Sequence, residues 1–250
     1  MSAPATTFAD RLPVPTDPPP VEGVLRHLGI AECVRLPLRV DAVRLGEELL
    51  ALPADAWGAA SRDPVVQASV ESFFAVGYPR GPRPVPPDDR PVLGRLPYLR
   101  RFVREIVPAS PTRAIVARLC GHGLIPIHTD TPRFFRGTVR LSVQVAADGR
   151  QRLFCNGLWY EMAPGEVWAI DNLSRHGVHN TSAQARVNVL VDYLPSNELA
   201  VLIGGGERGL GVRDDAATAT IETLSRERYR RMRWRALRYE IFKRIWRRRA

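Results

Sequence analysis

The chain of 250 residues and 27.9 kDa is long enough to bury a sizeable core, and its 45% hydrophobic and 25% charged residues are typical of a soluble globular protein rather than a disordered or fibrous one. No stretch approaches the roughly 18 uninterrupted apolar residues of a transmembrane helix. The first 20 residues lack the basic and apolar regions of a secretory signal, so we expect a cytoplasmic protein.

The net charge of +10 is concentrated at one end of the chain. Residues 226–250 contain 12 Lys or Arg and two Glu, which leaves 24 basic and 24 acidic residues among the first 225. Because the body is neutral, we do not expect nucleic acid to be a partner of the whole protein. The excess positive charge of the chain therefore lies in its C-terminal segment.

The N-terminal part is expected to combine a flexible arm with helices. Residues 1–20 contain six prolines and no hydrophobic period, which predicts a flexible arm. Helical spacing of apolar residues predicts helices at 40–52 and 98–106, and prolines and glycines predict a loop at 79–97. The three cysteines, at positions 33, 120 and 155, lack the CxxC spacing of zinc or redox sites and are expected to be reduced thiols in the core.

From residue 112 the pattern changes to short strands separated by turn residues. Strands are predicted at residues 112–119, 124–128, 138–145, 152–155, 158–162, 166–170 and 186–194. The dipeptides Asp148-Gly149 and Asn156-Gly157 are both of the hairpin type. Many short strands at this spacing indicate a β-sandwich or barrel.

A candidate metal site begins with His128 and Asp130. Residues two apart on an extended chain point to the same side, so both side chains could hold one ion. The motif is weak evidence by itself, because residues 129–132 also have the composition of a surface turn.

His176 and Arg186 make the metal interpretation stronger. His176 follows a predicted strand, and Arg186 lies ten residues further on at the start of the last one. Two histidines and one carboxylate form the facial triad of non-heme iron(II) oxygenases, which leaves positions for co-substrate and dioxygen. A guanidinium can hold the distal carboxylate of a 2-oxo acid through two parallel hydrogen bonds, which is the role we assign to Arg186.

The segments LIPIHTDTPRFFRGTVRLSVQV (124–145) and GLWYEMAPGEVWAIDNLSRHGVHNTSAQARVNVLVDY (157–193) resemble the aspartyl/asparaginyl β-hydroxylase family. The resemblance implies a mainly β fold with flanking helices: a double-stranded β-helix of the jelly-roll or cupin type over residues 21–200, with its core at 113–194 and a helical N-terminal part. It also implies an iron(II) ion held by His128, Asp130 and His176, with 2-oxoglutarate and dioxygen as co-substrates.

Family members carry an arginine two residues before a histidine on the strand that follows the first ligand, where the pair helps to hold the co-substrate. The matching positions here are Arg140 and Ser142. Arg140 fits this pattern, and Ser142 departs from it because a serine is shorter and uncharged. The departure puts in doubt how the co-substrate carboxylate nearest the metal is held.

Other residues near the motifs have structural interpretations. His179 is the rival of His176 for the third ligand, and the resemblance favours His176. His122 is expected in a turn, and His27 has no partner in view. Packing is expected for Trp159 and Trp168, and Asp171 with Asn172 is expected to shape the turn before His176.

Residues 218–250 are predicted to form a basic helix with Trp234, Leu237, Ile241 and Ile245 along one stripe. Three interpretations stay open for residues 226–250. The stripe could pack on the barrel, the helix could lie on an anionic membrane surface and make the protein peripheral at the inner membrane face, or it could bind an acidic partner or nucleic acid.

The leading functional hypothesis is hydroxylation of an amino acid, free or within a peptide, by a 2-oxoglutarate-dependent dioxygenase. One alternative with the same chemistry is hydroxylation of a lipid acyl chain at a membrane surface. Another is a non-catalytic metal-binding cupin, for which Ser142 is the sequence support.

Overall fold

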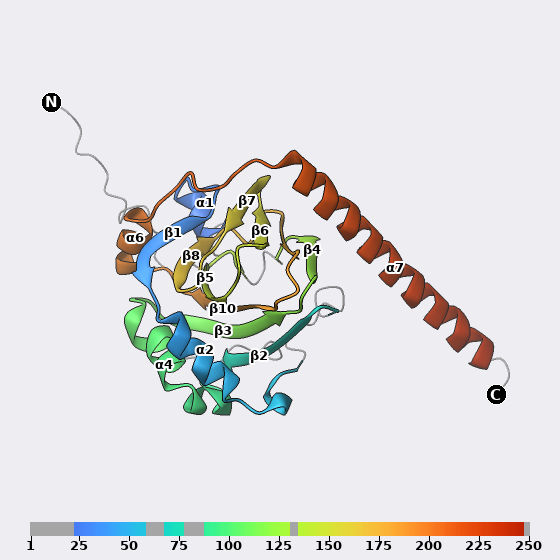
Figure 1. The fold of residues 1–250 in the computed structure, drawn as a ribbon, viewed down its shortest axis with the longest axis horizontal. Helices are drawn as coiled ribbons and strands as arrows, with labels where there is room; N and C mark the ends of the chain where they lie inside the picture. The colour runs from blue at the N-terminus through green and yellow to red at the C-terminus, as the bar shows by residue number, and fades with distance from the viewer. Residues whose placement is uncertain (1–22, 59–67, 78–87, 131–134, 248–250) are drawn as a thin grey trace.

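The computed structural model describes residues 23–58, 68–77, 88–130 and 135–247, without the side chains of residue 27 and of residues 235–247. The proline-rich arm predicted at residues 1–20 lies outside the described residues. The described chain forms a β-barrel flanked by helices, as Figure 1 shows, with the long helix α7 (Asp215–Arg247) on one side. In the described part, no helix is long and apolar enough to span a membrane.

The barrel consists of two antiparallel sheets. The large sheet has the order β1-β8-β5-β10-β3-β2 and the small sheet the order β4-β9-β6-β7. The strands of the large sheet are β1 (Val34–Arg39), β2 (Val70–Val76), β3 (Pro111–Leu119), β5 (Val139–Ala146), β8 (Glu166–Ile170) and β10 (Arg186–Tyr193). Those of the small sheet are β4 (Leu124–His128), β6 (Gln151–Cys155), β7 (Leu158–Glu161) and β9 (His176–Asn180).

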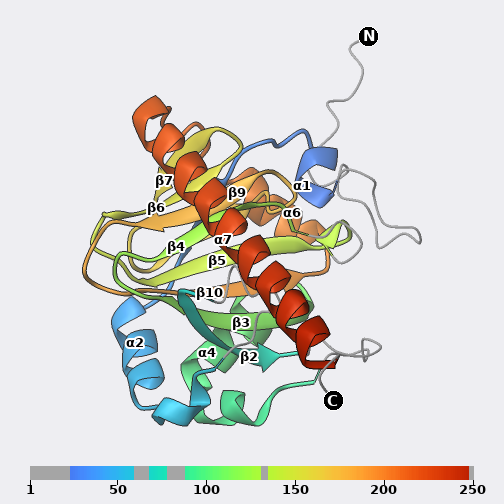
Figure 2. The same ribbon diagram turned by 90° about the vertical axis from the view of Figure 1, so that its right-hand side faces the viewer.

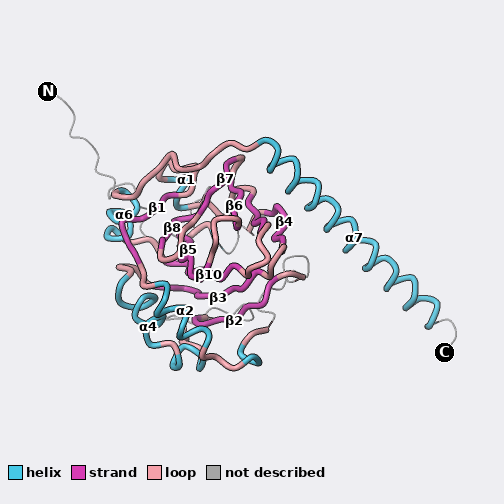
Figure 3. The backbone as a smooth tube through the Cα atoms, in the orientation of Figure 1, coloured by secondary structure: helices cyan, strands magenta, loops and turns pink. Residues whose placement is uncertain are grey.

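The order of these strands confirms the predicted fold class. From β3 to β10 the chain crosses repeatedly between the sheets, so that strands distant in sequence become neighbours within each sheet. This is the arrangement of a double-stranded β-helix. The magenta strands in Figure 3 enclose the barrel, and the cyan helices lie outside it.

Alternation along β5 explains why the large sheet has one apolar and one polar face. Val139, Leu141 and Val143 belong to the main hydrophobic core, where they pack with residues of the covering helices. Arg140 and Ser142 point to the opposite face, toward the small sheet, because successive side chains of a strand alternate. The polar face therefore lines the interior of the barrel.

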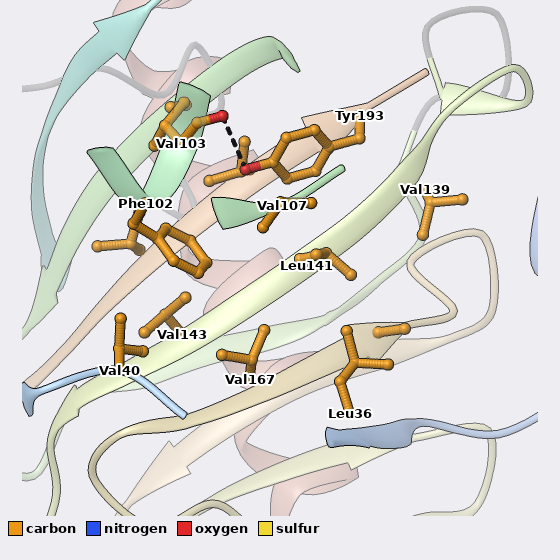
Figure 4. Packing of buried hydrophobic residues seen from close by; sticks show 14 of the residues in the cluster. Leu36, Val40, Phe102, Val103, Val107, Val139, Leu141, Val143, Val167 and Tyr193 are labelled. Carbon is orange, nitrogen blue, oxygen red and sulfur yellow. Dashed lines mark hydrogen bonds between the residues drawn. The ribbon is translucent and has the colours of Figure 1, made fainter. Parts of the chain in front are cut away.

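Helices cover the apolar face of the large sheet. They are α1 (Val24–His27), α2 (Ala42–Leu50), α4 (Pro97–Arg101) with its π-helical continuation η4 (Phe102–Ile106), and α6 (Asn197–Gly204), with short 3-10 turns η2 (Ala54–Ala56) and η3 (Pro91–Arg95). Figure 4 shows Phe102, Val103 and Val107 packed near Leu141 and Tyr193. The hydroxyl of Tyr193 donates to the Val103 carbonyl over 3.2 Å, which ties β10 to η4.

The structure confirms the strands predicted at residues 112–119, 124–128, 138–145, 152–155, 158–162, 166–170 and 186–194, with ends that differ by at most one residue. The helix predicted at 40–52 is α2, and Asp41 caps it by accepting a hydrogen bond from the Arg44 backbone N–H. The helix predicted at 98–106 ends as an α-helix at Arg101 and continues as the π-helical η4.

Four predictions need correction. The first is that strands β1, β2 and β9 were not expected. The second is that the loop predicted at 79–97 contains η3 and the start of α4. Pro91 and Pro97 take the first positions of these helices, where no N–H donor is needed. Residues 78–87 of that loop lie outside the described residues. Asp148-Gly149 joins β5 to β6, which lie in different sheets, so it turns a barrel corner instead of closing a hairpin. Cys33 and Cys155 are buried thiols, but Cys120 is exposed.

Asn156-Gly157 does close a hairpin. Both residues have positive φ angles, 50° and 84°, as the two central residues of a type I′ turn require, and the turn joins the paired strands β6 and β7. Trp159 in β7 and Trp168 in β8 are both buried packing residues, as expected.

Among the described side chains, those that pack helix α7 on the outer face of the small sheet lie in its N-terminal half. Ala217, Ile221 and Leu224 contact a cluster formed by Leu124, Ile127, Phe154 and Trp159. Figures 1 and 2 show the helix crossing this side of the barrel and extending past it. Trp234, the first residue of the predicted stripe, is 61% exposed, so the stripe does not pack on the barrel at this position.

Candidate active site

The two imidazoles of the predicted triad lie against each other inside the barrel. Strands β4 and β9 are neighbours, and His128 is paired with His176 across them. Gly177 allows this approach, because a Cβ at that position would lie 2.9 Å from the Ile125 carbonyl oxygen. The ring centroids of His128 and His176 are 4.3 Å apart, with the planes tilted by 49°.

Hydrogen bonds to the backbone fix both rings in the same tautomer. Nδ1 of His128 lies 2.8 Å from the Pro126 carbonyl, and Nδ1 of His176 lies 2.9 Å from the Ser174 carbonyl. A carbonyl only accepts, so each Nδ1 carries the proton and donates it, and each Nε2 keeps a free lone pair. Each histidine therefore presents the nitrogen that a metal ion needs.

His176 is held neutral. Burial, followed by the charge of His128, lowers the pKa of His176 to about 4. A neutral imidazole is the form that binds a metal, because a proton competes for the same lone pair. At neutral pH the ring is therefore ready to bind without first losing a proton.

Asp130 presents one carboxylate oxygen toward the imidazoles and uses the other for structure. Its Oδ2 accepts hydrogen bonds from the guanidinium of Arg140 and, over 2.9 Å, from the side-chain amide of Asn172. Its Oδ1 lies 3.9 Å from Nε2 of His128. Although burial raises the pKa of Asp130, the charge of Arg140 outweighs it, and the carboxyl pKa lies well below its usual range. Asp130 is therefore ionised.

The donor set fits a ferrous ion. One ligand atom each from His128, Asp130 and His176 lies within 4.8 Å of the other two. Two imidazole nitrogens and one anionic oxygen inside the barrel are the donor set of the facial arrangement that suits non-heme iron(II). In the described part of the chain, no other His, Cys, Asp and Glu side chains form such a group of three.

Arg140 lies in a network of charges behind the triad. In addition to its hydrogen bond to Asp130, Arg140 donates from Nε to Oδ1 of Asp192 over 2.8 Å. Arg113 pairs with the other oxygen of Asp192 at 2.7 Å. The two carboxylates raise the pKa of Arg140 above its ordinary value despite full burial. In this structure the guanidinium of Arg140 therefore orients the candidate ligand Asp130.

Arg186 is a buried cation with a neutral neighbour. It is 4% exposed at the start of β10, and its NH1 donates to Oδ1 of Asn188 over 3.0 Å. No carboxylate of the described residues forms a salt bridge with it, and burial lowers its pKa to about 10. A buried charge without a counter-ion is costly. The position therefore favours an anionic ligand inside the barrel.

Ser142 adds an unsatisfied polar group to the same interior face. Its hydroxyl is buried, and no hydrogen-bond partner lies within reach among the described residues. Ser142 is paired with Leu190 on one side and Trp168 on the other, neither of which offers a polar partner at the right place. An unsatisfied hydroxyl two residues from Arg140 fits contact with a polar co-substrate.

A pocket of about 380 Å³ opens beside His128, between β4 and α7. Its lining residues are Ile127, His128, Thr129, Arg175, Glu222, Ser225, Arg226 and Tyr229. Two hydrogen bonds hold helix α7 to β4, the strand that carries His128. The Ile127 N–H donates to Ser225 Oγ over 2.9 Å, and the Tyr229 hydroxyl donates to the Ile127 carbonyl over 3.3 Å. The C-terminal helix therefore forms one wall of a space next to the candidate centre.

Residues 89–195 match the family model described as Aspartyl/Asparaginyl beta-hydroxylase. This part of the chain is similar to the aspartyl/asparaginyl β-hydroxylase family. The family comprises 2-oxoglutarate-dependent hydroxylases, and the matched residues include the triad, Arg140, Ser142 and Arg186. No curated protein is significantly similar to the chain.

Several solved structures are similar to this chain. An oxidoreductase of the 2OG-Fe(II) oxygenase family from Burkholderia pseudomallei is 17% identical, with 70% of this chain and 89% of that chain covered and a TM-score of 0.48. A prolyl hydroxylase from Trichoplax adhaerens, in complex with a hypoxia inducible factor oxygen degradation domain peptide fragment, is 13% identical, with 71% and 90% covered and a TM-score of 0.44.

The remaining histidines lie apart from the candidate metal centre. His179 is three residues from His176, and alternation along β9 places it on the opposite face of the strand. His122 is exposed, with a φ of 52° in the turn between β3 and β4, as expected for a turn residue. The side chain of His27 is outside the described part of the structure.

Asn172 and Asp192 are site residues that sequence reasoning did not find. Asn172 was expected only to shape a turn. Its side-chain amide donates to the Asp130 carboxylate, and its backbone carbonyl accepts a hydrogen bond from the Asp130 N–H over 3.1 Å. Asp192 holds Arg140 in place from the far end of β10. For Asp192 the available signal was its position on the same face of a predicted strand as Arg186, six residues away.

Proposed function

We propose that the chain is an iron(II)- and 2-oxoglutarate-dependent dioxygenase that hydroxylates an amino acid, either free or within a peptide. The observation that carries the proposal is the convergence of His128, Asp130 and His176 within 4.8 Å in a barrel whose interior also holds the buried cation Arg186. The family match over residues 89–195 supports the same chemistry.

In this proposal each residue has a defined part. Nε2 of His128, Nε2 of His176 and Oδ1 of Asp130 hold the iron, while Asn172 and Arg140 fix the carboxylate through its other oxygen. A bound ferrous ion supplies the centre at which 2-oxoglutarate and dioxygen react to hydroxylate a C–H bond.

Arg186 would bind the distal carboxylate of 2-oxoglutarate, which would give its buried charge a counter-ion. Ser142 would donate its hydroxyl to the end of the co-substrate nearer the metal, in place of the histidine found in the family. Arg140 would contribute through Asp130, and through the co-substrate if its guanidinium exchanges one carboxylate partner for another.

The experiment is succinate release in the presence of iron(II), 2-oxoglutarate and ascorbate, screened over free amino acids, peptides and acylated lipids. We expect release above the uncoupled background with an amino acid or peptide. Release only with acylated lipids would refute the substrate class and leave the chemistry standing. If 2-oxoglutarate fails to bind the anaerobic manganese(II)-loaded protein, the site is that of a non-catalytic metal-binding cupin.

A further inference from the structure

Helix α7 has two halves with different surroundings. Up to Tyr229 it is attached to the small sheet through the apolar contacts of Ile221 and Leu224 and the hydrogen bonds to Ile127. From residue 230 the described side chains are mainly exposed, including those of Arg230 and Arg233. The helical backbone nevertheless continues without a break to Arg247.

The second half combines strong positive charge with large apolar residues. Residues 230–250 contain ten Lys or Arg and one Glu, together with seven aromatic or branched aliphatic residues at positions 234, 237, 239, 241, 242, 245 and 246. Positions 234, 237, 241 and 245 recur at helical spacing and fall on one side of the helix. Trp234, the member of this series with a described side chain, is 61% exposed.

The exposed Trp234 lies between Arg233 and Arg235 in the cationic half of the helix. A partner that accepts both features must offer negative charge next to an apolar layer. The interface of an anionic bilayer does so, because headgroups attract arginine while aromatic and aliphatic residues enter the boundary of the acyl region. Phosphate groups of a nucleic acid satisfy the charge but give no reason for isoleucine and leucine on one side.

We propose that residues 230–247 of α7 bind the surface of a membrane that contains anionic lipids, with the helix lying in the plane of the interface. The helix would keep the barrel at the membrane, because the first half of α7 is hydrogen-bonded to the strand that carries His128. This binding does not depend on the proposed chemistry, since it involves neither the triad nor the interior of the barrel.

The test is co-sedimentation of the full-length protein with phosphatidylcholine vesicles, with or without phosphatidylglycerol. We expect binding only when phosphatidylglycerol is present, and release at high salt, where charges are screened within a few ångströms. The variant R230E/R233E should bind roughly tenfold or more weakly, because each arginine near an anionic surface contributes separately. Trp234→Ala should also weaken binding.

The matched control is R95E/R101E, which changes the net charge equally at exposed positions near α4. We expect it to bind vesicles as the wild type does, within about twofold. Circular dichroism checks that each variant is folded, and succinate release in solution gives a readout that R230E/R233E should not change. Vesicle binding without succinate release would leave this proposal standing and count against the proposed function.

Three results would overturn the membrane proposal. The first is failure of the wild type to bind vesicles that contain phosphatidylglycerol. The second is equal weakening by R95E/R101E and R230E/R233E, which would show dependence on overall charge alone. The third is preferential binding to a DNA duplex over these vesicles, unaffected by Trp234→Ala, which would assign the segment to nucleic acid.

Discussion

The two faces of β5 and β10 come from the same strands but have opposite compositions. The outer face, with Leu141, Val143 and Val189, packs against helices in the main core. The inner face of the same strands carries Arg140, Ser142, Asn188, Asp192 and Arg186. Among the described residues, the hydroxyl of Ser142 has no hydrogen-bond partner and the guanidinium of Arg186 has no carboxylate counter-ion. Apolar packing on the outer face stabilises the fold. The buried polar groups of the inner face lower that stability but suit an anionic ligand.

His176→Ala is expected to have the largest effect on the inner side of this comparison. Loss of a direct ligand should weaken iron binding by more than about 100-fold, because even residues that only orient a ligand contribute 10- to 100-fold. Calorimetric titration with iron(II) under anaerobic conditions measures it, alongside succinate release. His179→Ala on the opposite face of β9 is the control, and an equal loss there would contradict the assignment of His176.

Leu141→Ala should affect the outer face alone. The side chain is fully buried in the main core, so its truncation should lower the free energy of unfolding by about 2–5 kcal/mol. Iron affinity should be unchanged. Ser142→Ala, one residue away on the inner face, should be neutral or stabilising in urea unfolding because it removes an unsatisfied hydroxyl. If both variants destabilised equally, the two faces would not differ as described.

The pH dependence of the free energy of unfolding of the metal-free protein tests how much the burial of His176 on the inner face destabilises the fold. The folded pKa of His176 is about 4, against about 6.5 when unfolded, so between these values the unfolded chain binds more protons. The free energy of unfolding should therefore fall as the pH drops from 6.5 to 4, by on the order of 1–3 kcal/mol. Urea unfolding of the wild type and of His176→Ala measures this fall in the free energy of unfolding, which should be smaller in the variant.

Asn172→Ala separates two parts of the inner site. Losing the amide that holds Oδ2 of Asp130 should weaken iron binding by about 10- to 100-fold. Asn188→Ala is the matched change, because Asn188 contacts Arg186 instead. It should raise the KM for 2-oxoglutarate while the iron affinity stays within about twofold of wild type. An iron affinity that falls equally in both variants would show that Asn172 has no special role.

The sequence predicted the strands that alternate clearly or carry a continuous apolar run, such as β5 and β8. It did not predict β1, where Pro37 interrupts the pattern, or β2, and the sheet order explains the proline in β1. These two strands are the edges of the large sheet, where proline is tolerated because one side needs no ladder of hydrogen bonds. Strand β9 has the composition of a loop, with Gly177 and two histidines, and is a strand because β4 and β6 pair with it on either side.

The triad could be found from sequence because its residue types and spacing are themselves the signal. The contacts that orient it could not. Asn172 meets Asp130 across 42 positions, and Asp192 meets Arg140 across 52, through strand pairing that no local pattern encodes. The interior pairing of Arg140 with two carboxylates is a property of the fold, whereas the departure at Ser142 was visible from the start.

The attachment of α7 to Ile127 limits how far the chain can be shortened. A protein that ends near residue 234 would retain the amide and carbonyl contacts made by Ser225 and Tyr229. One that ends before α7 would uncover the apolar cluster around Phe154 and Trp159, remove the far wall of the space beside His128, and be prone to aggregate. The first half of the C-terminal helix is thus an integral part of the barrel, its second half extends beyond the barrel, and the boundary between them lies close to Arg230.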